Sequence, residues 1–261
     1  MKAPVLMADR PSRDAQIERL REKGFVVVPG FVPADALKEL NEAARKQLSA
    51  RADPLEYEAD LQYPGAPLSR AAQGGETVRR LLEAYGREPL FARWSRAPDL
   101  RDWMAAYFGE SVLMSRVHHN CLMTKHPRYG SLTNWHRDIR YWAFEHEDLV
   151  SVWLALGEEH KDNGALWFVP GSHRMVFEPD RFDSARFFRT DRADSAEIIA
   201  TAESPRLEPG DAVFFHCNTL HSAGRNLSNA VKFSLVYTYH GRSNAAVEGT
   251  RSASKAEVPL D

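Results

Sequence analysis

Residues 150–174 read VSVWLALGEEHKDNGALWFVPGSHR, and they contain two short apolar runs separated by turn-forming residues. In the first run aliphatic residues occupy every second position, and Ser151, Trp153 and Ala155 stand between them. This is the period-two alternation of a β-strand. An Asn-Gly and a Pro-Gly dipeptide bound the second run, as turns between strands do. The stretch therefore predicts two strands of a β-rich core. The small-large-small face around Trp153 suits the lining of a cavity, although a core tryptophan in an all-buried strand would follow the same pattern.

The rest of the chain divides into a helical part and a strand-rich part. Apolar periodicity predicts helices near residues 12–23, 33–48, 76–92 and 97–108, a buried strand at Phe25–Val28, and a surface loop over residues 52–75. From about residue 110 to 242, short apolar runs alternate with turn-forming residues. Helices within residues 12–108 followed by strands predict an α+β fold, most simply a β-sandwich or barrel buttressed by N-terminal helices. We expect one domain over residues 1–261.

Charge and cysteine content exclude several classes of protein. With 34 basic and 36 acidic residues the formal net charge is −2, and neither sign collects in a run that favours nucleic acid. Cys121 and Cys217 are too few for a disulfide framework or a four-cysteine zinc site, and they suit a reducing compartment. The start, MKAPVLMADRPSRD, has no apolar leader, and no stretch reaches the length of a membrane span. We expect a cytoplasmic protein whose partners include neither nucleic acid nor a membrane.

The sequence TNWHRDIRYW, residues 133–142, places a histidine and an aspartate two residues apart. Side chains at such spacing project from the same side of an extended strand, so His136 and Asp138 could bind one ion. A third ligand should come from later in the chain, where His216 and His221 are available. Two histidines and one carboxylate are the ligands of non-heme iron(II) oxygenases, which leave the other coordination positions open. Taken alone, the spacing favours a solvated or core histidine over a metal ligand.

The stretch from Asn134 to Ser228 adds more specific motifs. The ordered series H-x-D, DNGALWFVPGSH, G-D and H-S-x-G-x-N closely resembles the phytanoyl-CoA dioxygenase family of iron(II)- and 2-oxoglutarate-dependent oxygenases. The resemblance covers residues 110–240 strongly and 15–50 weakly. It implies a double-stranded β-helix, which is a cupin-like jelly roll with helices packed outside. It also implies that His136, Asp138 and His221 bind iron(II), and that 2-oxoglutarate and O2 are the co-substrates.

The resemblance assigns further residues to the 2-oxoglutarate pocket. It places Trp153 beside 2-oxoglutarate, and Cys121 at a position that lines the pocket, where any small buried residue would also serve. The family usually has an arginine eleven residues after the distal histidine, where its planar fork grips the far carboxylate, but this chain has Lys232. A lysine loses the bidentate geometry. Ser234 shares its strand face, so the two could hold that carboxylate together; the alternatives are a solvated lysine and an anchor at Arg225.

His173 in the PGSH motif does not match an iron ligand of the family, and we expect it to be hydrogen-bonded near the rim. Halogenases on the same scaffold carry a small residue in place of the ligand aspartate, so Asp138 disfavours halogenation. We predict a dioxygenase that hydroxylates a small organic molecule and converts 2-oxoglutarate to succinate. Desaturation, cyclisation and epimerisation use the same chemistry and stay open, as do a non-catalytic metal- or ligand-binding jelly roll and a zinc hydrolase.

The substrate is less constrained by the sequence. Five basic residues lie in or next to the metal-bearing segments: Lys125, Arg128, Arg137, Arg140 and Arg174. The connection 175–196 mixes arginines with four phenylalanines and could form a lid over the pocket. These features suit an anionic small molecule, although surface arginines are common and the phenylalanines could simply dock the loop. Neither the identity of the substrate nor the oligomeric state follows from the sequence.

Overall fold

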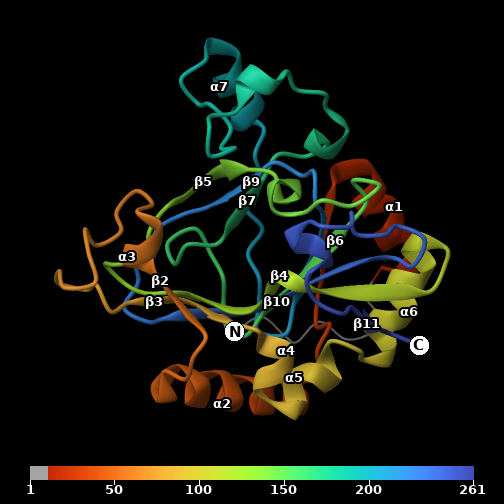
Figure 1. The fold of residues 1–261 in the computed structure, drawn as a ribbon, viewed down its shortest axis with the longest axis horizontal. Helices are drawn as coiled ribbons and strands as arrows, with labels where there is room; N and C mark the ends of the chain where they lie inside the picture. Colours follow the sequence, from red (N-terminus) through yellow and green to blue (C-terminus); the bar gives the residue numbers. More distant parts are fainter. Residues whose placement is uncertain (1–10) are drawn as a thin grey trace.

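The computed structural model describes residues 11–261, so the expectation that the chain starts without an apolar leader concerns residues that lie largely outside the described ones. Two antiparallel sheets form the core of the molecule (Figure 1). The minor sheet has the order β5 (Thr133–His136), β9 (His221–Ala223), β7 (Leu166–Phe168). The major sheet has the order β1 (Phe25–Val28), β8 (Ala212–His216), β6 (Val150–Ala155), β10 (Lys232–Gly241), β4 (Val112–Lys125), β3 (Val78–Leu82), β2 (Leu55–Tyr57), and β11 (Val258–Pro259) also pairs with β4.

Helices cover the outer face of the major sheet, as the lower and right-hand parts of Figure 1 show. The longer ones are α1 (Arg13–Lys23), α2 (Ala34–Ala50) and α6 (Pro98–Phe108), with α4 (Ala84–Arg87) and α5 (Pro89–Trp94) beside them. The remaining helical segments are α3 (Glu58–Leu61), α7 (Ala193–Ala200) and the 3-10 turns η2 (Asp138–Tyr141), η3 (Ser172–Arg174), η4 (Pro179–Arg181) and η5 (Arg251–Ala253).

The side chains on the two faces of the major sheet pack into two separate hydrophobic cores. Val152 and Leu154 of β6 pack into the large core under the helices. Trp153 and Ala155 point the other way, into a smaller core that also contains Phe168 of the minor sheet. This alternation confirms the predicted strand faces. Two facing sheets with helices outside confirm the predicted α+β jelly roll.

Four predicted elements are confirmed by the structure. The helix near 12–23 is α1, the strand at Phe25–Val28 is β1, the helix near 33–48 is α2, and the helix near 97–108 is α6. The expected stripe of α2, Leu37, Leu40 and Ala44, is buried against the sheet. These elements were predictable because their apolar periodicity matches the face that they bury.

The predictions for residues 52–92 were wrong in two places. The loop predicted over 52–75 contains strand β2 and helix α3, and the helix predicted over 76–92 begins as strand β3. Strand β3 pairs with β4, with Leu81 opposite Leu122, and this pairing overrides the helical propensity of the segment. Pro89 then interrupts any continuous helix because it cannot donate a backbone hydrogen bond, and it begins α5 instead.

Among residues 11–261, none of the helices is both long and apolar enough to cross a membrane.

Phe214 of β8 joins the sheet to its helical layer. Its ring is fully buried and lies 4.1 Å, between ring centroids, from Trp103 of α6. We expect Phe214→Ala to lower the free energy of unfolding by about 3–5 kcal/mol, because the lost contacts leave a cavity. Leu227→Ala, at a side chain that is 76% exposed, is the control. Urea denaturation measures both, and equal midpoints for the two variants would contradict this account of the core.

Candidate metal centre and its cavity

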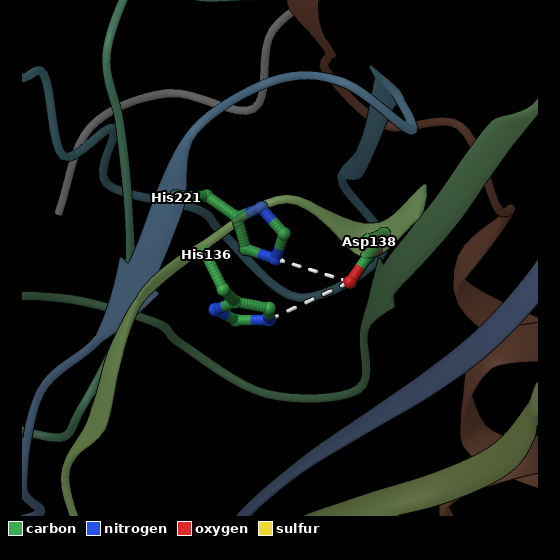
Figure 2. A group of neighbouring side chains, drawn as sticks. All are labelled: His136, Asp138 and His221. Carbon is green, nitrogen blue, oxygen red and sulfur yellow. Dashed lines mark ion pairs between the residues drawn. The ribbon is translucent and has the colours of Figure 1, made fainter. Parts of the chain in front are cut away.

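The pairing of β5 with β9 brings two histidines together. His136 is the last residue of β5 and lies directly opposite His221, the first residue of β9. Their imidazole centroids are 4.2 Å apart, although the residues are distant in sequence. Asp138 follows at the start of η2 and turns its carboxylate toward both rings (Figure 2).

The three side chains form one compact, buried group. The Asp138 Oδ1 atom lies 3.5 Å from Nε2 of His136 and 3.5 Å from Nε2 of His221. Donor atoms of all three residues lie within 4.8 Å of one another. The exposed fractions are 5% for His136, 0% for Asp138 and 4% for His221. The structure therefore brings together the predicted trio, on the side of the minor sheet that faces the major sheet.

Backbone carbonyls fix both imidazole rings. The Nδ1 of His136 lies 2.8 Å from the carbonyl oxygen of Asn134, and the Nδ1 of His221 lies 2.9 Å from that of Thr219. A carbonyl can only accept, so each Nδ1 donates and leaves the lone pair on Nε2. Burial, and after it the neighbouring His136, lowers the pKa of His221 to about 4. That ring is therefore neutral near pH 7, the form in which an imidazole binds a metal.

Asp138 carries a buried charge that the protein does not satisfy by hydrogen bonds. Neither carboxylate oxygen has a hydrogen-bond partner among the described residues. Burial by itself would raise the pKa of Asp138, but His119, His221 and His136 outweigh it and hold the pKa below its ordinary value. A buried carboxylate without donors is costly unless a cation is bound. Two Nε2 lone pairs and this carboxylate fit a divalent transition-metal ion.

One detail of the predicted geometry was wrong. The H-x-D pair does not lie along one strand, because β5 ends at His136 and Asp138 begins the 3-10 turn η2. The intervening Arg137 keeps extended dihedral angles, with φ −109° and ψ 138°. The two side chains therefore still face the same side, as period-two spacing requires.

The other two candidate histidines lie outside the trio. His216 ends β8, and its Nε2 is 3.5 Å from Asp148. His173 lies in η3, where its Nε2 is 3.1 Å from the carbonyl oxygen of Arg21, and burial lowers its pKa to about 4. The hydrogen bond expected for His173 is confirmed.

A cavity of about 60 Å³ adjoins the three ligands. Its wall includes Trp153 of β6 and Lys232 of β10, whose Nζ lies 4.9 Å from the centroid of the Trp153 ring. Ser234 is fully buried next to Lys232, at 3.3 Å between Oγ and Nζ. Cys121 is also fully buried, but the cavity is lined by its neighbour Met123 instead. Arg225 lies away from the cavity and donates to the carbonyl oxygen of Arg128.

Two residues of this region were missed in the sequence. Glu159 follows β6 and accepts hydrogen bonds from Lys232, Ser234 and Trp153, although GEEHKDNG reads as a polar turn. His119 lies in the cavity wall, where its Nδ1 is 3.2 Å from Asp138 Oδ2. A bulge interrupts the alternation of β4 at this point, since His118 has a φ of +63° and the register with β10 shifts. Bulges of this kind re-aim side chains and leave little trace in the sequence.

The fold and the site together define a class of protein. Two histidines and one aspartate beside the inner cavity of a jelly roll are the arrangement typical of metal-dependent oxygenases. The family model described as Phytanoyl-CoA dioxygenase (PhyH) matches residues 20–234, and the chain belongs to this family. Among curated proteins, the ectoine dioxygenase of Halomonas elongata is 27% identical over 92% of this chain and 74% of its own length.

Two solved structures show the same fold. The epimerase SnoN, solved with Fe3+, alpha ketoglutarate and nogalamycin RO, has a TM-score of 0.73 at 22% identity, over 95% of each chain. EctD from S. alaskensis, solved with 2-oxoglutarate and 5-hydroxyectoine, has a TM-score of 0.73 at 22% identity, over 95% of this chain and 86% of that one. The predicted family and dioxygenase class are confirmed, and so, at the level of the family, is the cofactor set of iron, 2-oxoglutarate and O2.

The geometry of the trio predicts which histidines are needed for metal binding and which are not. We expect His136→Ala, Asp138→Ala and His221→Ala each to abolish iron(II) binding, because each removes one of three ligands to a single ion. His216→Ala, the matched control, should keep most of it. Anaerobic calorimetric titration with iron(II), paired with an assay of succinate formation, measures the effect. Wild-type iron affinity in His221→Ala would rule out the assignment.

Proposed function

We propose that the chain is an iron(II)- and 2-oxoglutarate-dependent dioxygenase that hydroxylates a small organic molecule. The observation that carries this proposal is the buried trio of His136, Asp138 and His221, whose carboxylate has no hydrogen-bond donor. We assign these three residues as the iron ligands and treat residues 1–261 as one catalytic domain. The two free, buried cysteines support a cytoplasmic location.

Each residue of the site would have a distinct role in the reaction. His136 and His221 offer Nε2 lone pairs and are held in that tautomer by carbonyl oxygens. Asp138 supplies the negative charge and fills a third position, which leaves no room for a halide in its place. These three residues would hold iron(II), which when bound would supply the oxidative decarboxylation of 2-oxoglutarate by O2 to succinate and CO2, with one oxygen atom of O2 going to succinate and the other to the substrate. The cavity walls position 2-oxoglutarate and limit access of water.

Lys232 and Ser234 are our proposed anchor for the far carboxylate of 2-oxoglutarate. Both side chains are buried on the cavity side of β10, and the opposite face, Phe233 and Leu235, belongs to the large core. Trp153 would flank the same co-substrate, since its ring lines the cavity. Cys121 stays a weaker prediction, because its thiol contacts Met123 at 3.6 Å behind the wall.

Relatives with the same fold support more than one type of reaction. The names of curated relatives include ectoine dioxygenase and phytanoyl-CoA dioxygenase, which favour oxygenation of a small molecule. Among the similar structures are an epimerase and a carbocyclase. We favour hydroxylation because the family model and the named curated relatives of this chain are dioxygenases. Epimerisation is the second candidate.

The reaction type can be tested on the product. We expect its mass to rise by one oxygen atom, even in excess chloride, because Asp138 occupies the position that a halide would need. Mass spectrometry of a reaction in 18O2 measures this, and an unchanged mass would instead indicate epimerisation. A chlorinated product from the unmodified enzyme would contradict the role given to Asp138.

A second, larger cavity of about 730 Å³ is lined by Arg137, Ile139 and Arg140, the residues that flank Asp138 in the sequence. The connection that was predicted to form a lid, residues 175–196, contributes part of its wall, including Phe177, Phe182 and Arg186. Trp142 and Phe144 add apolar surface from the other side. We propose that this cavity receives the substrate. Movement of the connection as a lid stays a prediction.

Arg140 adds a positive charge to the wall of this cavity, and among residues 11–261 this side chain has no carboxylate partner within ion-pair distance. The guanidinium lies 4.0 Å from the centroid of the Phe187 ring, and that ring lies 5.9 Å from the ring of His136. Its Nη1 is buried and has no hydrogen-bond partner among the described residues. An arginine so placed is suited to a carboxylate or phosphate. We therefore propose an anionic substrate whose acid group contacts Arg140.

This assignment can be tested with paired compounds. We expect small carboxylates to stimulate 2-oxoglutarate consumption more than their carboxamides do, and Arg140→Met to remove the preference, roughly a tenfold effect. Arg189→Met is the matched control, because it makes the same change at an exposed arginine that pairs with Asp191. Preference for carboxylates that survives Arg140→Met would remove the basis of the proposal.

A further inference from the structure

Glu159 holds the groups that we assign to the co-substrate. Its Oε2 accepts from Lys232 Nζ at 2.8 Å, and its Oε1 accepts from Ser234 Oγ at 2.6 Å and from Trp153 Nε1 at 2.9 Å. The carboxylate is fully buried. Its backbone is fixed by two hydrogen bonds of 2.9 Å with Leu207, so the side chain starts from a rigid position.

Lys232 and Ser234 have few hydrogen-bond donors left for an incoming ligand. A serine hydroxyl has one hydrogen to donate, and that of Ser234 goes to Glu159. A lysine has three, and those of Lys232 point to Glu159 and, at 3.3 Å, to Ser234, so one remains. Glu159 contacts two residues of the cavity wall without lining the cavity itself. Glu159 therefore neutralises the charge of Lys232 from behind the cavity wall and does not occupy the cavity.

The other cations of this cavity are engaged as well. Arg79 Nη1 lies 3.4 Å from Glu58, and Arg80 donates to Glu56 at 2.6 Å. Lys125 stands opposite Lys232 in the β4–β10 register and donates to the carbonyl oxygen of Ser131 at 2.7 Å. Burial, and then the charge of Arg79, lowers the pKa of Lys125 well below its ordinary value. Three of the four cations that line this cavity, Arg79, Arg80 and Lys232, are therefore paired with carboxylates.

We propose that Glu159 is a specificity-determining residue for the co-substrate: it competes with the far carboxylate of 2-oxoglutarate for Lys232 and Ser234. The inference rests on the proposed function and deepens it. Lys232 and Glu159 already form a buried ion pair. A second carboxylate therefore gains electrostatic attraction only if the lysine is shared between the two carboxylates. The chain therefore discriminates weakly between 2-oxoglutarate and a 2-oxo acid of equal length without the second carboxylate.

Two acids and two variants test this inference. The far carboxylate is the only group that distinguishes 2-oxoglutarate from 2-oxopentanoate, and each can be titrated anaerobically into the iron(II) protein through the visible charge-transfer band of the chelate. In wild type we expect affinities within about tenfold of each other. Glu159→Gln keeps an acceptor for Trp153 and Ser234 but removes the charge. We expect it to bind 2-oxoglutarate roughly tenfold more tightly, with 2-oxopentanoate unchanged, whereas a merely structural role would move both acids together.

Glu158→Gln is the matched control, because it makes the same change one residue away, at an exposed side chain paired with Arg206. An equal gain in Glu158→Gln, or no gain in a folded Glu159→Gln, overturns the inference. So does a gain in Glu58→Gln alone, which would place the anchor at Arg79. If Glu159→Gln does not fold, the wild-type ratio decides, since a preference for 2-oxoglutarate of roughly a hundredfold or more is incompatible with a neutralised anchor.

The proposed function fails separately. If iron(II) binds but neither acid gives a chelate band in wild type or in Glu159→Gln, the co-substrate assignment is lost and the inference falls with it. If both acids give bands but Glu159→Gln leaves their affinities unchanged, only the inference is lost.

Discussion

The register between β5 and β9 is the constraint on which the site depends. It places His136 opposite His221 in a sheet of only three short strands. Such a small sheet could not fix two imidazoles by its own hydrogen bonds, and it is held by packing on the major sheet. Phe168 and Phe215 lie within 6.0 Å and 5.2 Å of the His221 ring, measured between centroids, and both belong to the core between the sheets. Since a one-residue slip would turn the histidines outward, this packing preserves the ligand geometry.

The same alternation explains why the molecule needs its helical layer. Strands β6 and β10 are buried on both faces, and only one face of each can serve the cavity. The other face is aliphatic or aromatic and requires cover, which the N-terminal helices supply in the larger core. The helices that cover the larger core therefore allow these strands to be apolar on one side and functional on the other.

How much could be predicted from the sequence depended on how local the signal was. His136 and Asp138 were readable because two-residue spacing survives even where the strand ends between them. Alternation predicted that Lys232 and Ser234 share one face of their strand, and the family resemblance predicted that this face lines the co-substrate pocket. Glu159 could not be found in this way, since its role depends on a turn folding back against β10. His119 was hidden by a bulge, and β3 by the pairing that decides between strand and helix for a short apolar run.

The distribution of unpaired charge links these observations. Three cations of the inner cavity have carboxylate partners, Glu56, Glu58 and Glu159, which lie behind its wall. The carboxylate of Asp138 is different, because it meets only imidazoles and has no hydrogen-bond donor among residues 11–261. The metal end of the cavity therefore carries the negative charge of Asp138 without a donor, whereas at the far end three positive charges are neutralised by carboxylates. If Glu159 competes for Lys232 as we propose, a 2-oxo acid would gain its main attraction from the metal ion, and the protein's own cations would contribute only as far as their partners release them.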